Sequence, residues 1–283
     1  MSIFTHILSS RLRKMKVISC INFKGGSGKT TTASNLAYCL AKRGKRVLTL
    51  DYDAQSSLST TSNIFYENDD HNIVSLLVNA LFDRPITAEN VRGCIVKTGF
   101  GYDLIGNTIT LADLEFNLTY KYKESDATIH ILKDILQKVD ADYDYCLIDC
   151  APSLGMMSLT ALSASDYVLI PSDLDLLSLH GVMRLVNRIN QVNDVTGSHT
   201  KVLGILKTKY RKTRKADYFV ADAMDTTFKA QNTYVFKTAI PESVVAKNSL
   251  IQDKLASQTK NVIGNAYHEL ADEILTILHD KED

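Results

Sequence analysis

A glycine-rich segment near the amino terminus carries residue types that are spaced for phosphate chemistry. It reads "NFKGGSGKTT" from Asn22 to Thr31 and lies between an apolar stretch and a helix-like one. A strand, a glycine-rich turn and a helix in this order bind anions, because the free N–H groups and the positive dipole end of the helix face the turn. We expect Lys29 to contact the β- and γ-phosphates of a nucleotide, and the Thr30 hydroxyl to ligate Mg²⁺.

The first glycine of the usual phosphate-loop pattern is replaced. That pattern is Gly, any four residues and then Gly-Lys-Ser/Thr, and its first position here is Phe23. We place Phe23 as the last core residue of the strand, so that Lys24 begins the loop. The glycines that let the backbone approach phosphate oxygens are Gly25, Gly26 and Gly28. The alternative, a solvated glycine loop, is disfavoured by the strand before it and the helix after it.

Three aspartates that follow strand-like runs could complete a nucleotide site. "LTLDYDAQ" supplies Asp51 and Asp53, and "YCLIDCAPS" supplies Asp149. Open α/β sheets bind ligands at the carboxyl ends of their strands, where these side chains would meet. We expect Asp149 to hold Mg²⁺ through its water shell and Asp53 to orient or deprotonate the attacking water. A lone aspartate at a strand end is more often a cap or turn residue, but three beside a phosphate loop favour the site.

The rest of the chain alternates strand-like and helix-like runs. The strand-like runs are continuous apolar stretches, which is typical of strands covered by helices on both faces, and they lie at 16–23, 46–51, 102–107, 143–149, 166–171, 201–208 and 234–240. The helix-like runs lie at 30–43, 73–82, 125–139, 156–164, 178–193, 216–230 and 259–279. The pattern predicts a three-layer α/β fold, with a mostly parallel twisted sheet between helices. We expect one ATPase domain over 15–283 and an amino-terminal extension over 1–14.

Composition narrows the class of protein. Lysine plus arginine and aspartate plus glutamate both number 32, so any attraction to nucleic acid must come from local clusters. The five cysteines lack CxxC spacing and fall mostly in apolar runs, which indicates buried thiols in a reducing compartment. No apolar run approaches the roughly 20 residues of a membrane span. We therefore expect a cytoplasmic protein without a membrane partner.

Five collinear segments resemble the ParA-type partition ATPases, whose deviant phosphate loop reads Lys-Gly-Gly-x-Gly-Lys-Thr/Ser. They are "KGGSGKTTTASNLA", "DYDAQSSLS", "YDYCLIDCAPSLG", "SDYVLIP" with "DLLSLHGV", and "VFKTAIPES". The resemblance covers nearly everything from Met15 onward. It implies the P-loop ATPase fold of the deviant Walker A type, with ATP and Mg²⁺ as cofactors and a slow basal rate of hydrolysis.

The resemblance also implies roles for individual residues. Two subunits would sandwich two ATP molecules, and Lys24 of each would reach the phosphates bound by the other, which gives the second lysine a role in transition-state stabilisation. Lys29 and Asp53 would complete the catalytic set. The implied nucleotide-binding residues are Lys24, Gly25, Gly26, Ser27, Gly28, Lys29, Thr30, Thr31 at the α-phosphate, and Thr208 and Pro241 near the adenine.

Two departures from the family pattern are visible. Ala54 and Ala151 stand where the family has prolines, which reduces the rigidity of two loops but removes no reacting group. Glu242 follows "IP", where the family often has an arginine that contacts DNA. A DNA surface copied from relatives is therefore not expected at that position.

A basic run, "KTKYRKTRK" over 207–215, contains six cations and no acid. Such a run is often only a solvated loop. Because the family that the chain resembles binds nonspecific DNA as a dimer, we expect the run to contact DNA phosphates without reading sequence. The predicted DNA-binding residues are Lys209, Arg211, Lys212, Arg214 and Lys215, and this would associate the protein with the nucleoid.

Three functions remain open from the sequence. The first is plasmid or chromosome partition, in which a ParB-like centromere-binding partner stimulates hydrolysis by an ATP-dependent homodimer. The second is a related positioning ATPase for a protein cluster or microcompartment. The third, a metabolic enzyme or electron donor with a metal cluster, is disfavoured by the cysteine positions.

The two ends of the chain differ in character. The carboxyl-terminal "YHELADEILTILHDKED" reads as a packed amphipathic helix rather than a membrane anchor. The amino-terminal "IFTHILSSRLRK" has an apolar face that could dock on the domain, a partner or a membrane.

Overall fold

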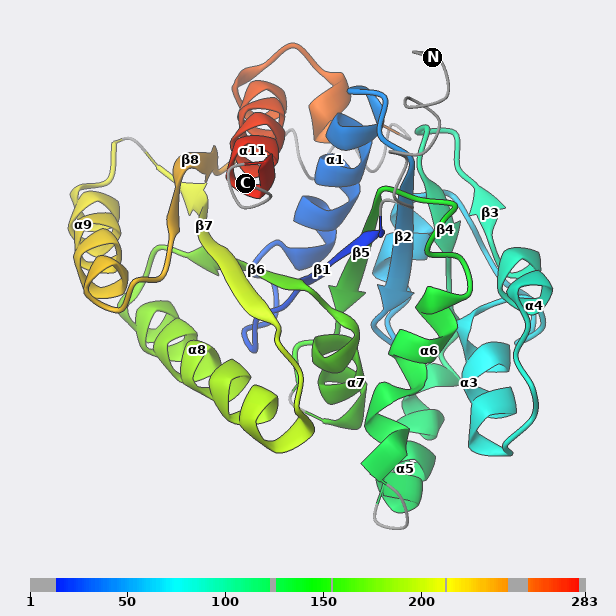
Figure 1. Ribbon diagram of the computed structural model, residues 1–283. Helices are drawn as coiled ribbons and strands as arrows, with labels where there is room; N and C mark the ends of the chain where they lie inside the picture. The colour runs from blue at the N-terminus through cyan, green and yellow to red at the C-terminus, as the bar shows by residue number, and fades with distance from the viewer. Residues whose placement is uncertain (1–13, 123–125, 154, 212, 244–253, 280–283) are drawn as a thin grey trace, which may run out of the picture.

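The computed structural model describes residues 14–122, 126–153, 155–211, 213–243 and 254–279 (Figure 1). The amino-terminal extension predicted over 1–14 therefore lies outside the described residues except for Lys14. The strands are β1 (Lys16–Cys20), β2 (Val47–Tyr52), β3 (Val96–Lys97), β4 (Asp103–Ile105), β5 (Tyr145–Cys150), β6 (Tyr167–Asp173), β7 (Lys201–Tyr210) and β8 (Val235–Pro241). They form one eight-stranded sheet in the order β3-β4-β2-β5-β1-β6-β7-β8.

The helices connect these strands and cover the sheet. They are α1 (Lys29–Ala41), α2 (Ser57–Thr61), α3 (Ile73–Leu81), α4 (Ala88–Gly93), α5 (Leu111–Tyr122), α6 (Ile131–Gln137), α7 (Met156–Ala164), α8 (Leu176–Thr196), α9 (Lys215–Ala230) and α11 (Val262–His279). Two 3₁₀ turns, η1 (Asp126–His130) and η2 (Ala256–Gln258), precede α6 and α11.

The sheet is parallel except for the short strand β3, which runs antiparallel to β4. The central strands are buried along their length, and β5 pairs with β1 from Lys16↔Tyr145 to Cys20↔Asp149. Parallel strands need helical crossovers, which cover both faces and exclude water from the sheet. The predicted three-layer α/β fold with a mostly parallel sheet is therefore confirmed.

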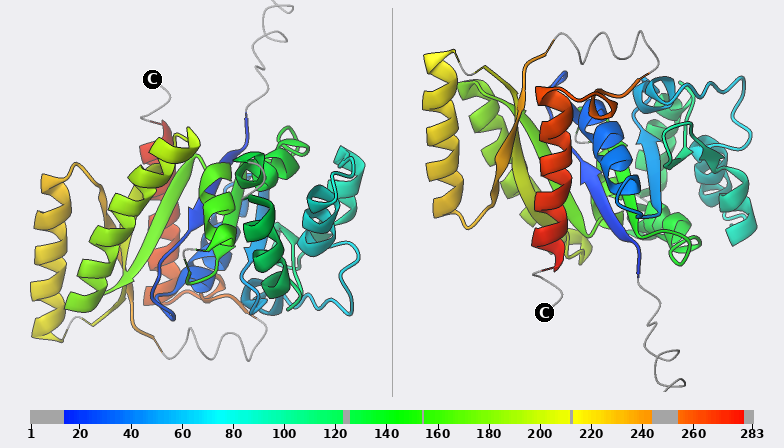
Figure 2. Two further views of the ribbon diagram at one scale, coloured as in Figure 1. Left: turned by 90° about the horizontal axis from the view of Figure 1, so that it is seen from below. Right: turned by 90° about the horizontal axis from the view of Figure 1, so that it is seen from above.

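Two hydrophobic cores lie on opposite faces of the sheet. One is formed by α1 and α11 against the strands and includes Leu36, Leu147 and Leu270. The other lies under α3, α5, α6, α7, α8 and α9 and includes Leu77, Ile148 and Leu185. Figure 2 shows α11 and α1 on one face and α7 and α8 on the other. This sandwich fixes the carboxyl ends of β1, β2 and β5 along one edge.

Several predicted boundaries were wrong. The first strand ends at Cys20 and not at 23, because the chain turns into the glycine loop; Phe23 lies beyond it, half-buried against the core. The run predicted as one helix over 125–139 is the turn η1 followed by α6. The strand predicted to end at 208 continues to Tyr210. The short elements β3, α2 and α4 were not predicted, and neither was α5.

Other expectations concern the cysteines and the membrane. All five cysteines are free and buried, as predicted from their apolar surroundings. Within the described ranges, a helix with both the length and the apolar character of a membrane span does not occur.

Candidate nucleotide site

The glycine-rich loop joins β1 to α1 at the carboxyl edge of the sheet. Gly26 and Gly28 have φ angles of 72° and 93°, in the left-handed region that side chains disfavour. Gly28 is the N-cap of α1 and provides no side-chain cap for the first turn. The N–H groups of that turn are therefore available to an anion, as a phosphate loop requires.

Lys29 and Thr30 start α1 inside this loop. Lys29 is only 7% exposed, and its Nζ lies 3.5 Å from the carbonyl oxygen of Lys24, so its ammonium group faces the concave side of the loop. The Thr30 hydroxyl donates to Asp149 Oδ2 at 2.6 Å. Two side chains that are 119 positions apart in sequence thus meet where a magnesium nucleotide would bind.

Asp149 is fully buried at the end of β5. Burial raises its pKa well above the usual value, and the nearby charge of Asp51 adds to this effect. Its second oxygen, Oδ1, has no hydrogen-bond partner among the described residues. A buried carboxylate with an unused acceptor is costly unless a cation or its bound water pairs with it. The residues therefore fit a hydrated Mg²⁺ held between Thr30 and Asp149.

Asp53 lies in the turn that follows β2, on the same edge. Its Oδ1 accepts a hydrogen bond from the Gln55 N–H at 3.0 Å, so the carboxylate stabilises the turn that contains Asp53. Asp51 is fully buried, and Ser59 donates to its Oδ2 through both N–H and hydroxyl at 2.7 Å. Burial raises the pKa of Asp51 to about 6 despite these hydrogen bonds.

Lys24 points away from the concave side of its own loop. Its Nζ lies 2.6 Å from Asp175 Oδ2, 3.2 Å from Asp173 Oδ2 and 3.1 Å from the Ser178 hydroxyl. The hydrogen bond with Asp175 is the largest cause of a raised pKa for Lys24, and it outweighs the effect of burial. The two lysines of the segment therefore have different environments.

The resemblance places both Thr208 and Pro241 near adenine. In the structure Thr208 lies against the glycine loop, whereas Pro241 lies at the end of β8. Thr208 is 3% exposed, and its hydroxyl contacts the Ser27 carbonyl oxygen at 3.0 Å and Asp173 Oδ1 at 3.3 Å. Pro241 ends β8 in register with Tyr210. Thr208 thus supports the glycine loop through its hydrogen bond to Ser27. The adenine contact of both residues stays a prediction.

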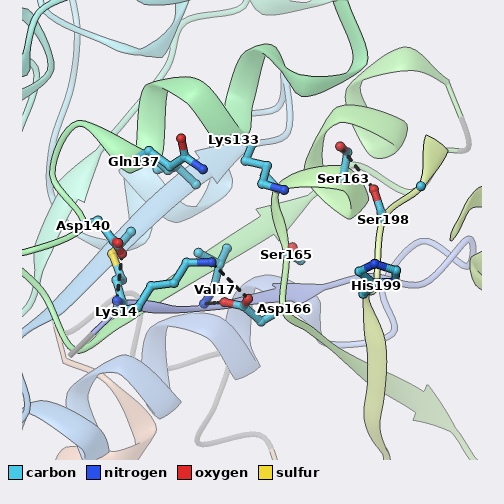
Figure 3. A pocket seen from close by; sticks show the side chains of 14 residues that line it. Lys14, Val17, Lys133, Gln137, Asp140, Ser163, Ser165, Asp166, Ser198 and His199 are labelled. Carbon is cyan, nitrogen blue, oxygen red and sulfur yellow. Dashed lines mark hydrogen bonds and ion pairs between the residues drawn. The ribbon is translucent and has the colours of Figure 1, made fainter. Parts of the chain in front are cut away.

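Two cavities lie at opposite edges of the sheet. A cavity of about 420 Å³ opens beside Thr30 and Thr31, between α1, the 55–61 segment and residues 254–256. A smaller cavity of about 190 Å³ lies at the amino edge of the sheet (Figure 3). There Asp140 accepts a hydrogen bond from the Met15 N–H, and Asp166 accepts one from the Val17 N–H in β1. The carboxylates of this second cavity are used to fix the start of the sheet.

The chain matches the AAA domain family over residues 15–202. The sporulation initiation inhibitor protein Soj of Bacillus subtilis (strain 168) is 34% identical over 229 residues, which cover 81% of this chain and 85% of that protein. The chromosome partitioning protein ParA of Myxococcus xanthus (strain DK1622) is also 34% identical, over 81% of this chain and 76% of that protein. The chain belongs to the ParA family of P-loop ATPases.

A solved structure resembles this ParA family member over most of its length. It is the cobyrinic acid a,c-diamide synthase of Mycobacterium smegmatis with a bound ATP analogue and magnesium, with a TM-score of 0.76 and 27% identity. The match covers 92% of this chain and 94% of that one. The phosphate-loop fold of the ParA member thus occurs in a protein that holds both ligands.

The basic run of this ParA member is partly neutralised within the chain. Lys207 and Lys209 lie in β7, and Lys207 Nζ is 3.0 Å from Asp225 Oδ1. Lys209 Nζ is 3.2 Å from Asp173 Oδ2, the carboxylate that also contacts Lys24.

Beyond β7 the arginines of the run have acidic partners too. Arg211 forms a two-pronged contact with Glu242, with Nη2 to Oε1 at 2.7 Å. Arg214 Nε lies 3.6 Å from Asp217 Oδ1. Lys215 is exposed at the start of α9, whereas Lys212 lies outside the described residues. The run therefore presents less positive charge than its sequence indicates.

Sequence reasoning missed three polar residues of this site. Asp173 and Asp175 hold Lys24, and Asn107 binds the turn that carries Asp53. All three stand at or just beyond the carboxyl ends of predicted strands. Asp53 and Asp149 were selected because open α/β sheets bind ligands at the carboxyl ends of their strands. The same rule could therefore have identified these three residues as well.

Proposed function

We propose that this ParA family member hydrolyses ATP as a switch that drives plasmid or chromosome partition. The observation that supports this proposal best is that Thr30 contacts Asp149, with the charge of Lys29 acting on the same carboxyl group, while Lys24 is paired with Asp175 instead. A pocket for a magnesium nucleotide needs only the first three. A further lysine beside the loop suits a contact with a nucleotide bound to a second subunit.

Within the pocket each side chain has a distinct task. Bound Mg²⁺ would neutralise charge that develops on the β- and γ-phosphates. Thr30 would ligate the ion, and Asp149 would hold its water shell through Oδ1, which has no donor in the part of the chain that the structure describes. Lys29 and the N–H groups of the loop, including those of Gly25, Gly26, Ser27 and Gly28, would bind the β- and γ-phosphates, with Thr31 at the α-phosphate.

Asp53 would orient the attacking water or take its proton. Its turn stands at the same sheet edge as Asp149, since β2 and β5 are neighbours and Asp51 pairs with Asp149 in register. General-base catalysis requires the carboxylate within hydrogen-bond reach of that water. Turnover would be slow until a second subunit supplies Lys24, because the transition-state charge is otherwise incompletely neutralised.

The ATP-bound dimer would bind nonspecific DNA through the basic run, and a ParB-like partner would stimulate hydrolysis and release. The DNA contacts we propose are Lys209, Arg211, Lys212, Arg214 and Lys215. Contacts of this kind give affinity without sequence readout, so binding should fall steeply with salt. Because Arg211 is held by Glu242, the Glu242→Gln variant should bind unrelated duplexes more tightly. Unchanged DNA binding after replacement of the five cations by alanine would rule out this site.

Hydrolysis with and without a purified partner tests the proposal. The partner would be captured on the immobilised protein with ATP and Mg²⁺. We expect the captured protein to be a centromere-binding protein. A cargo protein without DNA-binding activity would indicate instead a positioning ATPase for a protein cluster or microcompartment.

The variants Lys24→Ala and Lys133→Ala would be compared in the same assay. Lys24→Ala should bind ATP but form no ATP-dependent dimer on a sizing column, while Lys133→Ala, at the amino edge, should behave as the wild type. Fast hydrolysis that needs neither partner nor Lys24 would contradict the switch.

A further inference from the structure

Asn107 is a buried amide at the nucleotide edge that the phosphate-loop machinery does not explain. It stands two residues beyond the end of β4 and is 2% exposed. Its Nδ2 donates to the Asp53 carbonyl oxygen at 2.7 Å and lies 3.2 Å from the Asp51 carbonyl oxygen. Its Oδ1 accepts from the Ser56 hydroxyl. One side chain just beyond β4 thus contacts the turn after β2 at both of its ends.

The orientation of this amide is fixed by its neighbours. If Nδ2 and Oδ1 were exchanged, Oδ1 would face the carbonyl oxygens of Asp51 and Asp53, and an amide NH₂ would face the Ser56 hydroxyl. Two acceptors cannot form a hydrogen bond, so the network selects a single arrangement. The donor arm of Asn107 is therefore directed at the residue that carries the water-handling carboxylate.

The turn itself has a reason to need this support. Ser56 has a φ of 51°, in the left-handed region that disfavours a residue other than glycine. The Ser56 N–H closes the turn by donating to the Asp53 carbonyl oxygen at 2.8 Å, which is also the acceptor for Asn107. The family proline that would stiffen this turn is Ala54 here. The hydrogen bonds from the Asn107 side chain add to this single backbone hydrogen bond in holding the turn.

We infer that Asn107 is a positioning residue for hydrolysis, which holds the Asp53 turn so that its carboxylate meets the attacking water. This inference rests on the proposed role of Asp53. Among the described residues, the hydrogen bonds of Asn107 go to the 51–56 turn and not to the phosphate loop, so its effect should fall on the chemical step and not on nucleotide binding. A misplacement of about 1 Å at a reacting group can cost about 100-fold in rate.

The test compares Asn107→Ala with Asn193→Ala in the full chain. Asn193 also clamps a backbone segment through both ends of its amide, to Thr200, but it lies at the amino edge. Asn107→Ala should lower kcat for ATP by about 10- to 100-fold. Affinity for a fluorescent ATP analogue, and dimerisation with a nonhydrolysable analogue, should stay within about 2-fold of the wild type if geometry at Asp53 alone is lost. Asn193→Ala should keep the wild-type kcat.

A double-variant cycle separates positioning from general damage. In the Asp53→Ala background, Asn107→Ala should produce no further loss of kcat, because the group that it positions is absent. Equal losses in both backgrounds, or a wild-type kcat for Asn107→Ala, would overturn the inference. If Asn107→Ala does not fold, Ser56→Ala replaces it, since it removes only the hydroxyl that fixes the amide; a wild-type kcat there would count equally against the inference.

The same experiment distinguishes this inference from the proposed function. A wild-type kcat for Asp53→Ala would remove the role of Asp53 and the inference with it. An inactive Asp53→Ala protein together with a fully active Asn107→Ala protein would overturn only the inference.

Discussion

The ammonium group of Lys24 lies 2.6 Å from Asp175 Oδ2 within the same chain, and Asp173 Oδ2 is 3.2 Å away. Burial alone would raise the pKa of Asp175, but the hydrogen bonds from Lys24 and Ser178 outweigh it and lower the pKa. The lysine proposed to reach a partner's nucleotide must therefore leave two carboxylates first. Lys24 and Asp175 are each 42% exposed, so solvent limits the stabilisation to about 1 kcal/mol or less.

The Asp175→Asn variant should strengthen the ATP-dependent dimer. Asparagine can still cap α8, where Asp175 Oδ1 accepts from the Ser178 N–H, but it removes the nearer of the two charges that hold Lys24. The Lys24–Asp175 ion pair is lost in both subunits of the dimer, so the dissociation constant should fall by about 2- to 10-fold. Sedimentation equilibrium with a nonhydrolysable ATP analogue measures this change.

The control for this variant is Asp142→Asn, which removes a comparable exposed ion pair with Arg92 at the opposite edge of the sheet. It should leave the dimer constant unchanged. A weaker or unaltered dimer for Asp175→Asn would show that the ion pair does not compete with dimerisation.

The Thr30→Val variant should lose the benefit of magnesium for nucleotide binding. Valine keeps the shape of the side chain but removes both the metal ligand and the donor to Asp149 Oδ2. Loss of such a partner typically lowers metal affinity by about 10- to 100-fold. Titration of a fluorescent ATP analogue with and without Mg²⁺ measures the effect.

Thr49→Val provides the control, because Thr49 is a buried threonine of β2 whose hydroxyl donates to the Asp103 carbonyl oxygen and not to Asp149. It should lower stability without changing the magnesium dependence. If both variants respond to Mg²⁺ as the wild type does, Thr30 is not a metal ligand.

The sequence allowed the fold, and the sheet edge on which the proposed site residues lie, to be predicted because both depend on local patterns. Continuous apolar runs identified the parallel strands, and their ends identified Asp53 and Asp149 at one edge. The helix α5 was overlooked although Leu111, Leu114 and Leu118 give it an apolar stripe. The strand β3 has two residues, too few for any period to be visible.

What could not be predicted depends on contacts between distant parts of the chain. Lys24 and Asp175 are 151 positions apart in sequence. They meet because β1 and β6 are neighbours in the sheet, and neither segment alone indicates this strand order. The basic run looked strongly cationic because its partners Asp225 and Glu242 lie outside it in sequence. Charge counted along a segment therefore overestimates the charge that the folded surface presents.

The Thr208→Val variant should destabilise the protein and weaken nucleotide binding together. The change removes a buried hydroxyl that contacts the Ser27 carbonyl oxygen in the phosphate loop. An unpaired buried acceptor costs about 1–3 kcal/mol. The melting temperature and the affinity for ATP should both fall, since one contact supports both. Loss of stability with unchanged affinity would indicate that the loop keeps its shape without Thr208.

The carboxylate of Glu273 in α11 joins the helix to the outer strand β8. Its Oε1 accepts from the Tyr234 hydroxyl and the Lys237 N–H at 2.7 Å, and its Oε2 accepts from the Thr238 N–H at 3.0 Å. Burial alone would raise the pKa of Glu273, but these hydrogen bonds outweigh it and lower the pKa. The native state therefore holds the ionised form more strongly than the unfolded state does.

This shift predicts the sign of a pH dependence. A lowered carboxyl pKa contributes stability that is present above the unfolded pKa, near 4, and is lost as pH falls through the folded pKa. The Glu273→Gln variant should be about 1–2 kcal/mol less stable than the wild type at pH 7, a value reduced from the full range because the side chain is partly exposed. The difference should shrink as the pH falls below 4 in urea titrations. A difference that stays constant from pH 7 to pH 3 would show that the charge of Glu273 does not contribute to the α11–β8 contact.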